Sequence, residues 1–326
     1  KLCGFKMQWC NLPDPLVVVV GPTAVGKTDA ALRLAETLNA EIVSADSRLF
    51  YRGMDIGTAK PSSAERQRVP HHLIDVCNPD ETWSLSVFQQ AAKDVIDGIY
   101  SRGRLPLLVG GTGQYVRAVI EGWAAPAQEP DARMRQVLEG WAAEIGPVEM
   151  HHRLAVLDPV AAGRILPGNI RRTIRALEVI FSTGRRFDDQ RIKRGSAYSL
   201  LIIGLRRPRS EVYVRVDARI DQMVANGLLE EVCGLLARGY SAQLPSMSAI
   251  GYREMVAVLE GRITLANAVL SMKSLTHQYV RRQANWFKES DPTIHWFDAG
   301  TDCLDAMVTL IHSCPDWTPR DSGPEA

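Results

Sequence analysis

The sequence lacks the features that mark membrane, secreted and zinc-binding proteins. No apolar run approaches the roughly 18 residues that a membrane-spanning helix requires. The six cysteines include no CxxC pair, so the usual spacing of a zinc site is absent. The histidine pairs at 71–72 and 151–152 have no third ligand at a suitable spacing, which favours structural roles. Sparse, unpaired cysteines are typical of a reducing compartment, and we expect a cytoplasmic protein with no membrane partner.

The sequence also has almost no net charge. Its 38 Lys and Arg residues oppose 37 Asp and Glu residues, which leaves +1 over 326 residues. Any surface for nucleic acid must therefore come from local clustering of basic residues. The first residues contain no signal-peptide core, and we expect a leader over 1–15. An acidic tail over 301–326 is expected to be disordered at its end.

The chain does contain the alternation of strands and helices of an α/β protein. Residues 16–20 form a short β-branched run typical of a buried strand, and residues 21–28 follow as a turn. Apolar residues at 31, 34, 35 and 38 then predict an amphipathic helix. This order of strand, loop and helix is typical of a parallel sheet. Further strands are predicted at 41–44, 104–109 and 200–205.

The pattern changes between 121 and 199, where helical periods interrupted by Pro and Gly replace strands. We interpret this stretch as a helical insertion domain within a core made of 16–120 and 200–300. Breaks are expected at Pro126, Pro130, Gly146-Pro147, Pro167-Gly168 and Gly184. Helices are predicted again at 211–226, 228–237, 252–259 and 265–288.

A phosphate-binding loop follows the first strand. The sequence GPTAVGKT at 21–28 fits the pattern G-x-x-x-x-G-K-[ST], with a predicted strand before it and a predicted helix after it. Its glycines let successive backbone N–H groups face inward, and the helix N-terminus adds partial positive charge. Lys27 is a point charge for phosphate oxygens, and Thr28 can ligate Mg²⁺. The motif does not choose between ATP, GTP and a diphosphate ester.

A carboxylate is predicted beside this loop. Ligands of parallel sheets bind beyond the carboxyl ends of the strands, and the strand at 41–44 delivers Asp46 to that edge. There Asp46 has three possible roles, which are to hold Mg²⁺ through water, to act as a general base or only to close a turn.

A string of further motifs runs in order from about residue 16 to residue 290. After the phosphate loop come DSRLFY at 46–51, GMDIGTAKP at 53–61, PHHLID at 70–75, LLVGGTG at 107–113, RRTIRALEV at 171–179, RVDAR at 215–219, AIGYR at 249–253 and RRQANWF at 281–287. Together they resemble the tRNA dimethylallyltransferases, also called tRNA isopentenyltransferases. Eukaryotic members often carry a C-terminal zinc finger, and its absence here indicates the bacterial type.

The resemblance implies an α/β fold with a P-loop NTPase-like core and a parallel sheet. It also implies a transferase that moves a dimethylallyl group from dimethylallyl diphosphate to N6 of the adenosine 3′ of the anticodon (tRNA position 37), in tRNAs that read codons starting with U. Diphosphate is released, Mg²⁺ is the cofactor, and a monomer grips the anticodon stem-loop of tRNA. Because N6 lies on the pairing edge of the base, the adenosine must leave its stack.

The same resemblance assigns roles to individual residues. Asp46 becomes the general base at N6, while Thr23, Lys27 and Arg219 grip the diphosphate and stabilise its charge as it leaves. Thr28 becomes the Mg²⁺ ligand. The implied diphosphate-binding residues are Gly21, Pro22, Thr23, Ala24, Val25, Gly26, Lys27 and Thr28. The implied tRNA-binding residues are Asp46, Ser47, Arg48, Leu49, Thr112, Arg133, Arg171, Arg172, Arg175, Ile250, Gly251, Tyr252, Arg253, Arg281 and Arg282.

Basic residues gather in the predicted insertion. Between 164 and 194 there are nine Lys and Arg residues against three acidic ones. Such a strip would neutralise phosphates and give salt-dependent binding, whereas on charge alone a solvated helix face explains it too. The resemblance favours the anticodon stem-loop. The sequence departs from the family at Leu49, Gln114, His277 and Asn285, where Gln, Leu, Arg and Thr are common.

Three other functions remain open. A P-loop kinase of a small metabolite would use the insertion as a lid and would form ADP. An enzyme that prenylates free adenine nucleotides would not need the basic strip. An RNA-binding regulator with a relict loop would not need to keep Lys27, Thr28, Asp46 and Arg219 intact.

Overall fold

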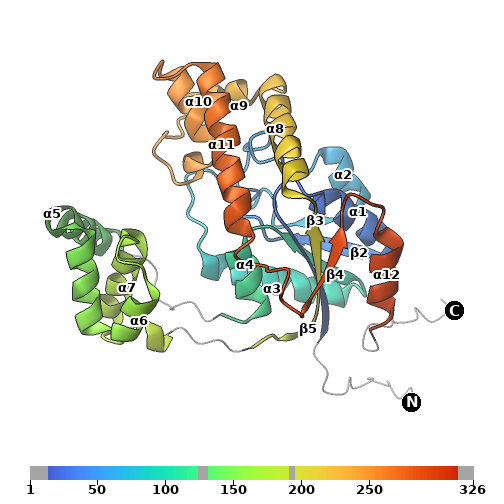
Figure 1. The fold of residues 1–326 in the computed structure, drawn as a ribbon, viewed down its shortest axis with the longest axis horizontal. Helices are drawn as coiled ribbons and strands as arrows, with labels where there is room; N and C mark the ends of the chain where they lie inside the picture. The colour runs from blue at the N-terminus through green and yellow to red at the C-terminus, as the bar shows by residue number, and fades with distance from the viewer. Residues whose placement is uncertain (1–13, 124–130, 191–194, 315–326) are drawn as a thin grey trace, which may run out of the picture. The chain divides into compact units, whose positions relative to one another are not determined.

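The computed structural model describes residues 14–123, 131–190 and 195–314, and they divide into two compact units (Figure 1). Unit 1 comprises the described residues up to Ile120 and from Ser196 onward, and unit 2 lies within Glu121–Gly195. Most of the predicted leader and the end of the predicted tail, like Pro126 and Pro130, lie outside the described residues.

Unit 1 is built on a parallel sheet. In the described residues this sheet has six strands in the order β3-β2-β4-β1-β5-β6, and every neighbouring pair is parallel. The predicted α/β class is confirmed, as are the four predicted strands, although β1 starts within the predicted leader. Two short strands, β3 and β6, were not predicted. The strands are β1 (Asp14–Val20), β2 (Ala40–Ser44), β3 (His71–His72), β4 (Leu105–Gly110), β5 (Tyr198–Arg206) and β6 (Ile294–Asp298).

Strand β1 is buried on both faces. Val17 and Val19 pack into one core with α1 (Lys27–Leu38) and α12 (Leu304–His312). Leu16, Val18 and Val20 pack into a second core with α3 and α4, which cover the opposite face. A strand covered on both faces needs apolar residues at every position, which explains its continuous apolar run. The two helices of the second core are α3 (Leu85–Ser101) and α4 (Gly113–Ile120).

Helix α12 lies within the predicted acidic tail of 301–326, in which the sequence predicted no helix. Met307 and Ile311 are almost fully buried against α1 and β1, so this segment belongs to the core of unit 1. The helix was not predicted because its nine residues are surrounded by acidic and polar sequence.

Four helices stand beyond the carboxyl end of the sheet (Figure 1). They share a third core that includes Ala24 of the phosphate loop and Met54. The predicted helices at 228–237 and 252–259 have the expected bounds. The last helix ends at Gln283 rather than 288, because Trp286 packs on Gly113 and Phe287 is buried in the core behind α4. The four are α8 (Arg209–Ala225), α9 (Leu228–Ala237), α10 (Tyr252–Leu259) and α11 (Leu265–Gln283).

Glu231 of α9 fixes the segment after the second strand. Its carboxylate accepts hydrogen bonds from the backbone N–H groups of Asp55 and Ile56, each at 2.8 Å, and of Gly57 at 3.2 Å. It also accepts a bond of 2.6 Å from the hydroxyl of Tyr252. A short capped helix, α2 (Ser63–Arg68), follows this segment.

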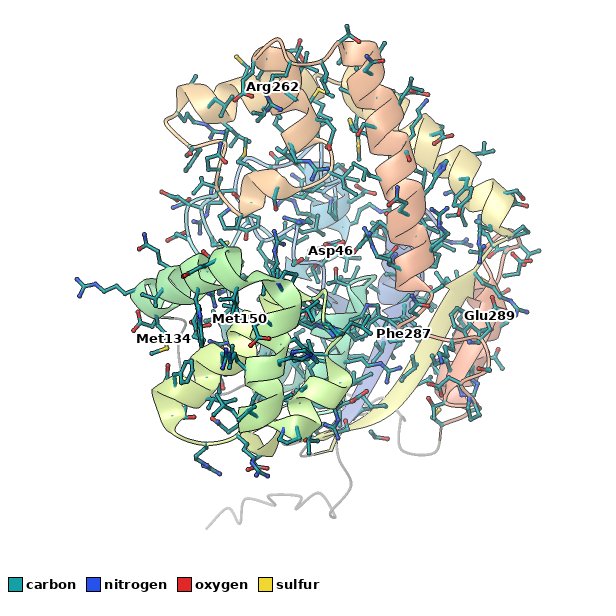
Figure 2. All side chains as sticks on the ribbon, turned by 60° about the vertical axis from the view of Figure 1, so that its left-hand side comes forward. Asp46, Met134, Met150, Arg262, Phe287 and Glu289 are labelled. Carbon is teal, nitrogen blue, oxygen red and sulfur yellow. The ribbon has the colours of Figure 1, made fainter. Side chains whose placement is uncertain are left out.

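Unit 2 is helical, as predicted. Its elements are α5 (Ala132–Leu157), α6 (Pro159–Arg164) and α7 (Ile170–Thr183), with a short 3₁₀ turn at Asp188–Gln190. Helix α5 is kinked at Gly146 and Pro147, where the sequence predicts a break. Met150, labelled in Figure 2, is fully buried, and it packs with Leu154 and Leu177 in the core that these helices form.

The histidine pairs have the structural roles that the sequence favours. His71 bonds the carbonyl of Val69, and His151 bonds the carbonyls of Ala162 and Ile165. Within 14–123, 131–190 and 195–314, no cluster of three or more His, Cys, Asp or Glu residues is arranged to hold a metal ion. No helix of those ranges has the length and apolar composition to cross a membrane.

Glu41 of β2 is a buried carboxylate with three basic partners. It accepts hydrogen bonds from Arg102 at 2.6 Å, Arg104 at 3.2 Å and His72 at 2.6 Å. Burial alone would raise the pKa of Glu41, but the bonds from Arg102 and His72 outweigh it and hold the pKa at about 2. The cluster ties β2 and β3 to the end of α3 and the start of β4, at the amino end of the sheet.

We expect Glu41→Gln to lower the free energy of unfolding at pH 7 by about 2 kcal/mol, because two arginines then lack their buried partner. The folded pKa lies below the unfolded value of 4.5, so the stabilisation is present above that value and is lost as the pH falls toward about 2. Urea unfolding at about pH 7, 4 and 3 measures both effects. Glu36→Gln, which breaks the exposed pair with Arg68, is the control. Equal losses in the two variants would contradict the prediction.

Candidate active site

The phosphate loop connects β1 to α1 at the carboxyl end of the sheet. Gly26, the N-cap of α1, has a φ of 116°, and Ala24 has a φ of 62°. These left-handed residues curl the loop over the helix N-terminus, whose first N–H groups have no partner within the helix. A side chain at Gly21 would place its Cβ 2.6 Å from the carbonyl oxygen of Leu205, so this position requires glycine.

Basic side chains hold the carbonyl oxygens of this loop. Lys27 donates to the carbonyl of Pro22 at 2.8 Å. Arg215 donates to Ala24 at 2.7 Å, and Arg207 donates to Val25 at 3.0 Å. Because a peptide group is planar, engaging its C=O on one side directs the neighbouring N–H to the other. The loop is therefore set for an anion before any ligand binds.

Lys27, Arg219 and Asp46 lie close enough to influence one another's charges. Burial lowers the pKa of Lys27 to about 8, Asp46 opposes this shift, and Arg219 adds to it. Protein packed around Arg219 lowers the pKa of its guanidinium, as does Arg215, while Asp46 raises it. Two cations thus face a single carboxylate, and this excess of positive charge favours a multiply charged anion. The structure brings together these three residues from distant parts of the sequence.

Asp46 closes a turn just after β2. Its Oδ1 accepts the N–H of Arg48 at 3.0 Å, and its carbonyl accepts the N–H of Leu49 at 3.1 Å. The turn orients the carboxylate, which the same structure places in a pocket beside the phosphate loop. Asp46 is half-buried, and Figure 2 labels it in unit 1 between the sheet and the helices beyond it. Closing a turn and lining a ligand site are therefore not alternatives for this residue.

That pocket is lined by both polar and apolar side chains. Polar groups come from Lys27, Thr28, Ser44, Asp46 and His71. Besides Ala31, the apolar lining includes five larger side chains, here called the apolar wall: Ile42, Leu49, Pro61, Ile74 and Val109. A ligand with a charged head and a short hydrocarbon tail fits this lining better than one that is polar throughout.

Two residues of α11 that the sequence did not single out reach the same region. The phenol of Tyr279 is hydrogen-bonded to the side chain of Thr112, and burial together with the charge of Asp46 raises its pKa. Gln283 accepts the N–H of Thr23 at 2.8 Å and donates to the carbonyl of Gly111 at 2.9 Å. Gln283 falls within the motif RRQANWF, which was the available signal.

The sequence-predicted tRNA residues of unit 1 differ in exposure. Arg253, Arg281 and Arg282 are exposed, while Ile250, like Ser47, Arg48, Leu49 and Thr112, is half-buried. Tyr252 is fully buried and hydrogen-bonded to Glu231, and the adjoining Gly251 is buried too. The structure thus places the side chain of Tyr252 in the core, and the tRNA contact implied for this residue stays a prediction.

In unit 2, Arg133, Arg171 and Arg172 are exposed. Arg175 is half-buried and pairs with the buried carboxylate of Glu178 at 3.1 Å, so its charge is partly used within the fold. Arg164 pairs with Asp188 at 2.6 Å, and Arg185 and Arg186 are exposed. The remaining basic residues of the strip, 191, 193 and 194, lie outside the described residues.

Comparisons of sequence and comparisons of structure find the same group of known proteins to be similar to this chain. The family model described as IPP transferase matches residues 49–290. A tRNA dimethylallyltransferase of Roseiflexus sp. (strain RS-1) is 54% identical over 302 residues, which are 93% of this chain and 99% of that protein. The tRNA isopentenylpyrophosphate transferase of Bacillus halodurans is 43% identical with a TM-score of 0.67, over 92% of this chain and 94% of that one.

A eukaryotic dimethylallyltransferase acting on tRNA superposes with a TM-score of 0.78 at 24% identity, over 91% of this chain and 78% of that one. At that identity the likeness concerns the fold alone.

The lowered pKa of Lys27 predicts that the affinity of the site for anions depends on pH. Above pH 8 the ammonium loses its proton, so we expect the affinity for Mg²⁺-diphosphate to fall by about tenfold per pH unit. Calorimetric titration between about pH 7 and 9.5 measures it. The Lys27→Met variant is the control for titration of the diphosphate itself. We expect this variant to bind weakly, and it has no ammonium at position 27 that could lose a proton. A ratio of the two affinities that stays constant over the range contradicts the prediction.

Proposed function

The chain belongs to the IPP transferase family, and on that premise we propose that it transfers a dimethylallyl group from dimethylallyl diphosphate to N6 of the adenosine 3′ of the anticodon in tRNA. Relatives named tRNA dimethylallyltransferase that match almost the whole chain carry the proposal. The pocket supports it, because a cationic phosphate loop, a carboxylate and a short apolar wall meet there.

The phosphate loop and its cations are suited to a leaving diphosphate. As the bond between carbon and oxygen breaks, negative charge grows on the oxygens that leave. Lys27 and Arg219, which both interact with Asp46, and the N–H groups of the loop would stabilise that charge. Thr23 belongs to the same loop, where Gln283 fixes its backbone N–H.

The oxygen donors of the pocket fit Mg²⁺. The hydroxyls of Thr28 and Ser44 and the carboxylate of Asp46 line the same pocket, and Mg²⁺ prefers such hard oxygen ligands together with phosphate oxygens and water. Thr28 would hold the ion directly, and Asp46 would hold it through water. When bound, the ion neutralises part of the charge on the diphosphate.

The rest of the pocket is suited to the transfer itself. Leu49, Ile74 and Pro61 form an apolar wall that keeps water away from the allylic carbon, which becomes positive as diphosphate leaves. The amine of adenine is a weak nucleophile, and Asp46 would accept its proton. The adenosine would enter past Thr112, which Tyr279 holds by a hydrogen bond. The new bond joins N6 to the allylic carbon, and the proton of N6 goes to Asp46.

The P-loop kinase alternative is not favoured. The relatives that match over the length of the chain are named as prenyl transferases, and the pocket offers an apolar wall of five side chains beside the phosphate loop. We further propose that the substrates are tRNAs reading codons that start with U, that the enzyme is a cytoplasmic monomer, and that unit 2 is the tRNA-gripping insertion.

The decisive assay combines purified protein, Mg²⁺, labelled dimethylallyl diphosphate and an unmodified anticodon stem-loop with adenosine 3′ of the anticodon. Label in the RNA is expected for the wild type. Asp46→Asn should lower transfer by at least about a thousandfold because the base is lost, while diphosphate binding stays within a few-fold. Asp94→Asn, on an exposed face of α3, is the control. Unlabelled RNA in this assay, together with ADP formation in a parallel reaction supplied with ATP, would overturn the proposal.

The exposed arginines of unit 2 predict how RNA binding depends on salt. The double variant Arg171→Ala/Arg172→Ala should weaken binding of the stem-loop by about tenfold at low salt, and the slope of log K against log [salt] should fall by about 1.5. Arg153→Ala is the matched control, because Arg153 is an exposed arginine of the same unit that is already paired with Glu149. Equal effects of the two changes on the slope would refute a specific RNA contact.

A further inference from the structure

Gln283 connects three parts of the chain with one buried amide. It is the last residue of α11 and only 7% exposed. Its Oε1 accepts the N–H of Thr23 in the phosphate loop, and its Nε2 donates to the carbonyl of Gly111 in the loop after β4. Both halves of the amide are thus used, each for a backbone group of a different loop.

Gln283 lies so close to Gly111 that another side chain could not easily replace the contact between them. A side chain at Gly111 would place its Cβ 2.5 Å from Nε2 of Gln283 and 3.3 Å from Nζ of Lys27. The glutamine therefore lies directly against the loop that borders the Lys27 ammonium. A carboxylate here could not donate to Gly111. An apolar side chain would leave the N–H of Thr23 and the buried carbonyl of Gly111 without this partner, which is costly.

Helix α11 reaches the acceptor side of the pocket as well. Tyr279 lies one turn before Gln283, so the two side chains share a face of the helix, and its hydroxyl is bonded to Thr112. Between them, Arg281 and Arg282 are exposed, and Arg281 donates to the hydroxyl of Tyr213 on α8. One rigid element therefore carries a contact to the phosphate loop, a contact to the loop beside the acceptor, and two surface cations.

We propose that Gln283 is a positioning residue that couples the two substrate sites, so that diphosphate and RNA each increase the affinity for the other. The bond to Thr23 sets the phosphate loop in the arrangement that receives diphosphate. The same amide fixes the end of α11 and hence Tyr279, Arg281 and Arg282. A ligand that orders one end of this linkage lowers the cost of ordering the other, and the coupling is necessarily reciprocal. The RNA half of this inference rests on the proposed function.

The test measures binding of the unmodified stem-loop with and without saturating Mg²⁺-diphosphate. In the wild type, diphosphate should raise the RNA affinity by about fivefold or more. In Gln283→Met, which keeps the length of the side chain but makes neither bond, this factor should fall to about one, and Mg²⁺-diphosphate should bind about tenfold more weakly. RNA affinity without diphosphate should stay within about twofold, because the surface cations of α11 remain.

Two further variants make the result specific. Gln89→Met removes another glutamine amide, which is half-buried, lies away from the pocket and donates to the carbonyl of Ala118 at 2.7 Å. It should leave the coupling factor unchanged. Gln283→Asn keeps the amide but is one methylene too short, and it repeats the test if the Met variant does not fold, as judged by its thermal melting.

Three outcomes overturn the inference. The first is that diphosphate does not change the RNA affinity of the wild type. The second is that a folded Gln283 variant keeps the coupling factor of the wild type. The third is that Gln89→Met loses as much of the coupling factor as the Gln283 variant does. Failure of the proposed function is distinguishable, because it appears as absent prenyl transfer by the wild type. The loss of diphosphate affinity in Gln283→Met does not depend on that reaction.

Discussion

The phosphate loop must keep its N–H groups turned inward, and much of unit 1 serves this constraint. A loop of eight residues cannot do so alone, because each of its carbonyl oxygens also needs a partner. Arg207 and Arg215 supply two of these partners from β5's end and α8, and Lys27 supplies a third. Gln283 takes the N–H of Thr23. The helices beyond the sheet are therefore the support of the loop as well as a separate layer.

The same constraint explains the charges of the pocket. Burial lowers the pKa values of Lys27 and Arg219, and repulsion between cations adds to this: Arg219 acts on Lys27, and Arg215, which holds the loop, acts on Arg219. Asp46 offsets this repulsion only in part. An anionic ligand relieves it, so part of the binding free energy comes from a repulsion already present in the free protein. The carboxylate of Asp46 accepts the N–H of Arg48 within its own turn. This bond keeps the carboxylate in a fixed orientation when the ligand leaves.

Local sequence patterns predicted most of the strands, the phosphate loop and several of the helices of this molecule. The contacts between distant parts of the chain could not be predicted from them. The β1 strand, the phosphate loop and Asp46 could be recognised because each is a short, contiguous pattern with its own chemistry. The role of Gln283 could not, because its partner Thr23 is 260 residues away. The burial of Tyr252 could not be predicted for a related reason. The motif AIGYR at 249–253 gives no sign that Glu231 of a neighbouring helix accepts a hydrogen bond from the hydroxyl of Tyr252.

The substitution at His277 shows how this support tolerates change. The family often has Arg at this position of α11, and a shorter side chain could have loosened the helix from α8. Instead the imidazole stacks on Tyr213 with ring centroids 4.1 Å apart, and its Nε2 lies 2.9 Å from a carboxylate oxygen of Asp217. The ring contact with Tyr213 and the hydrogen bond to Asp217 together attach this part of α11 to α8. Because α11 keeps this attachment to α8, Tyr279 and Gln283 keep their places at the pocket.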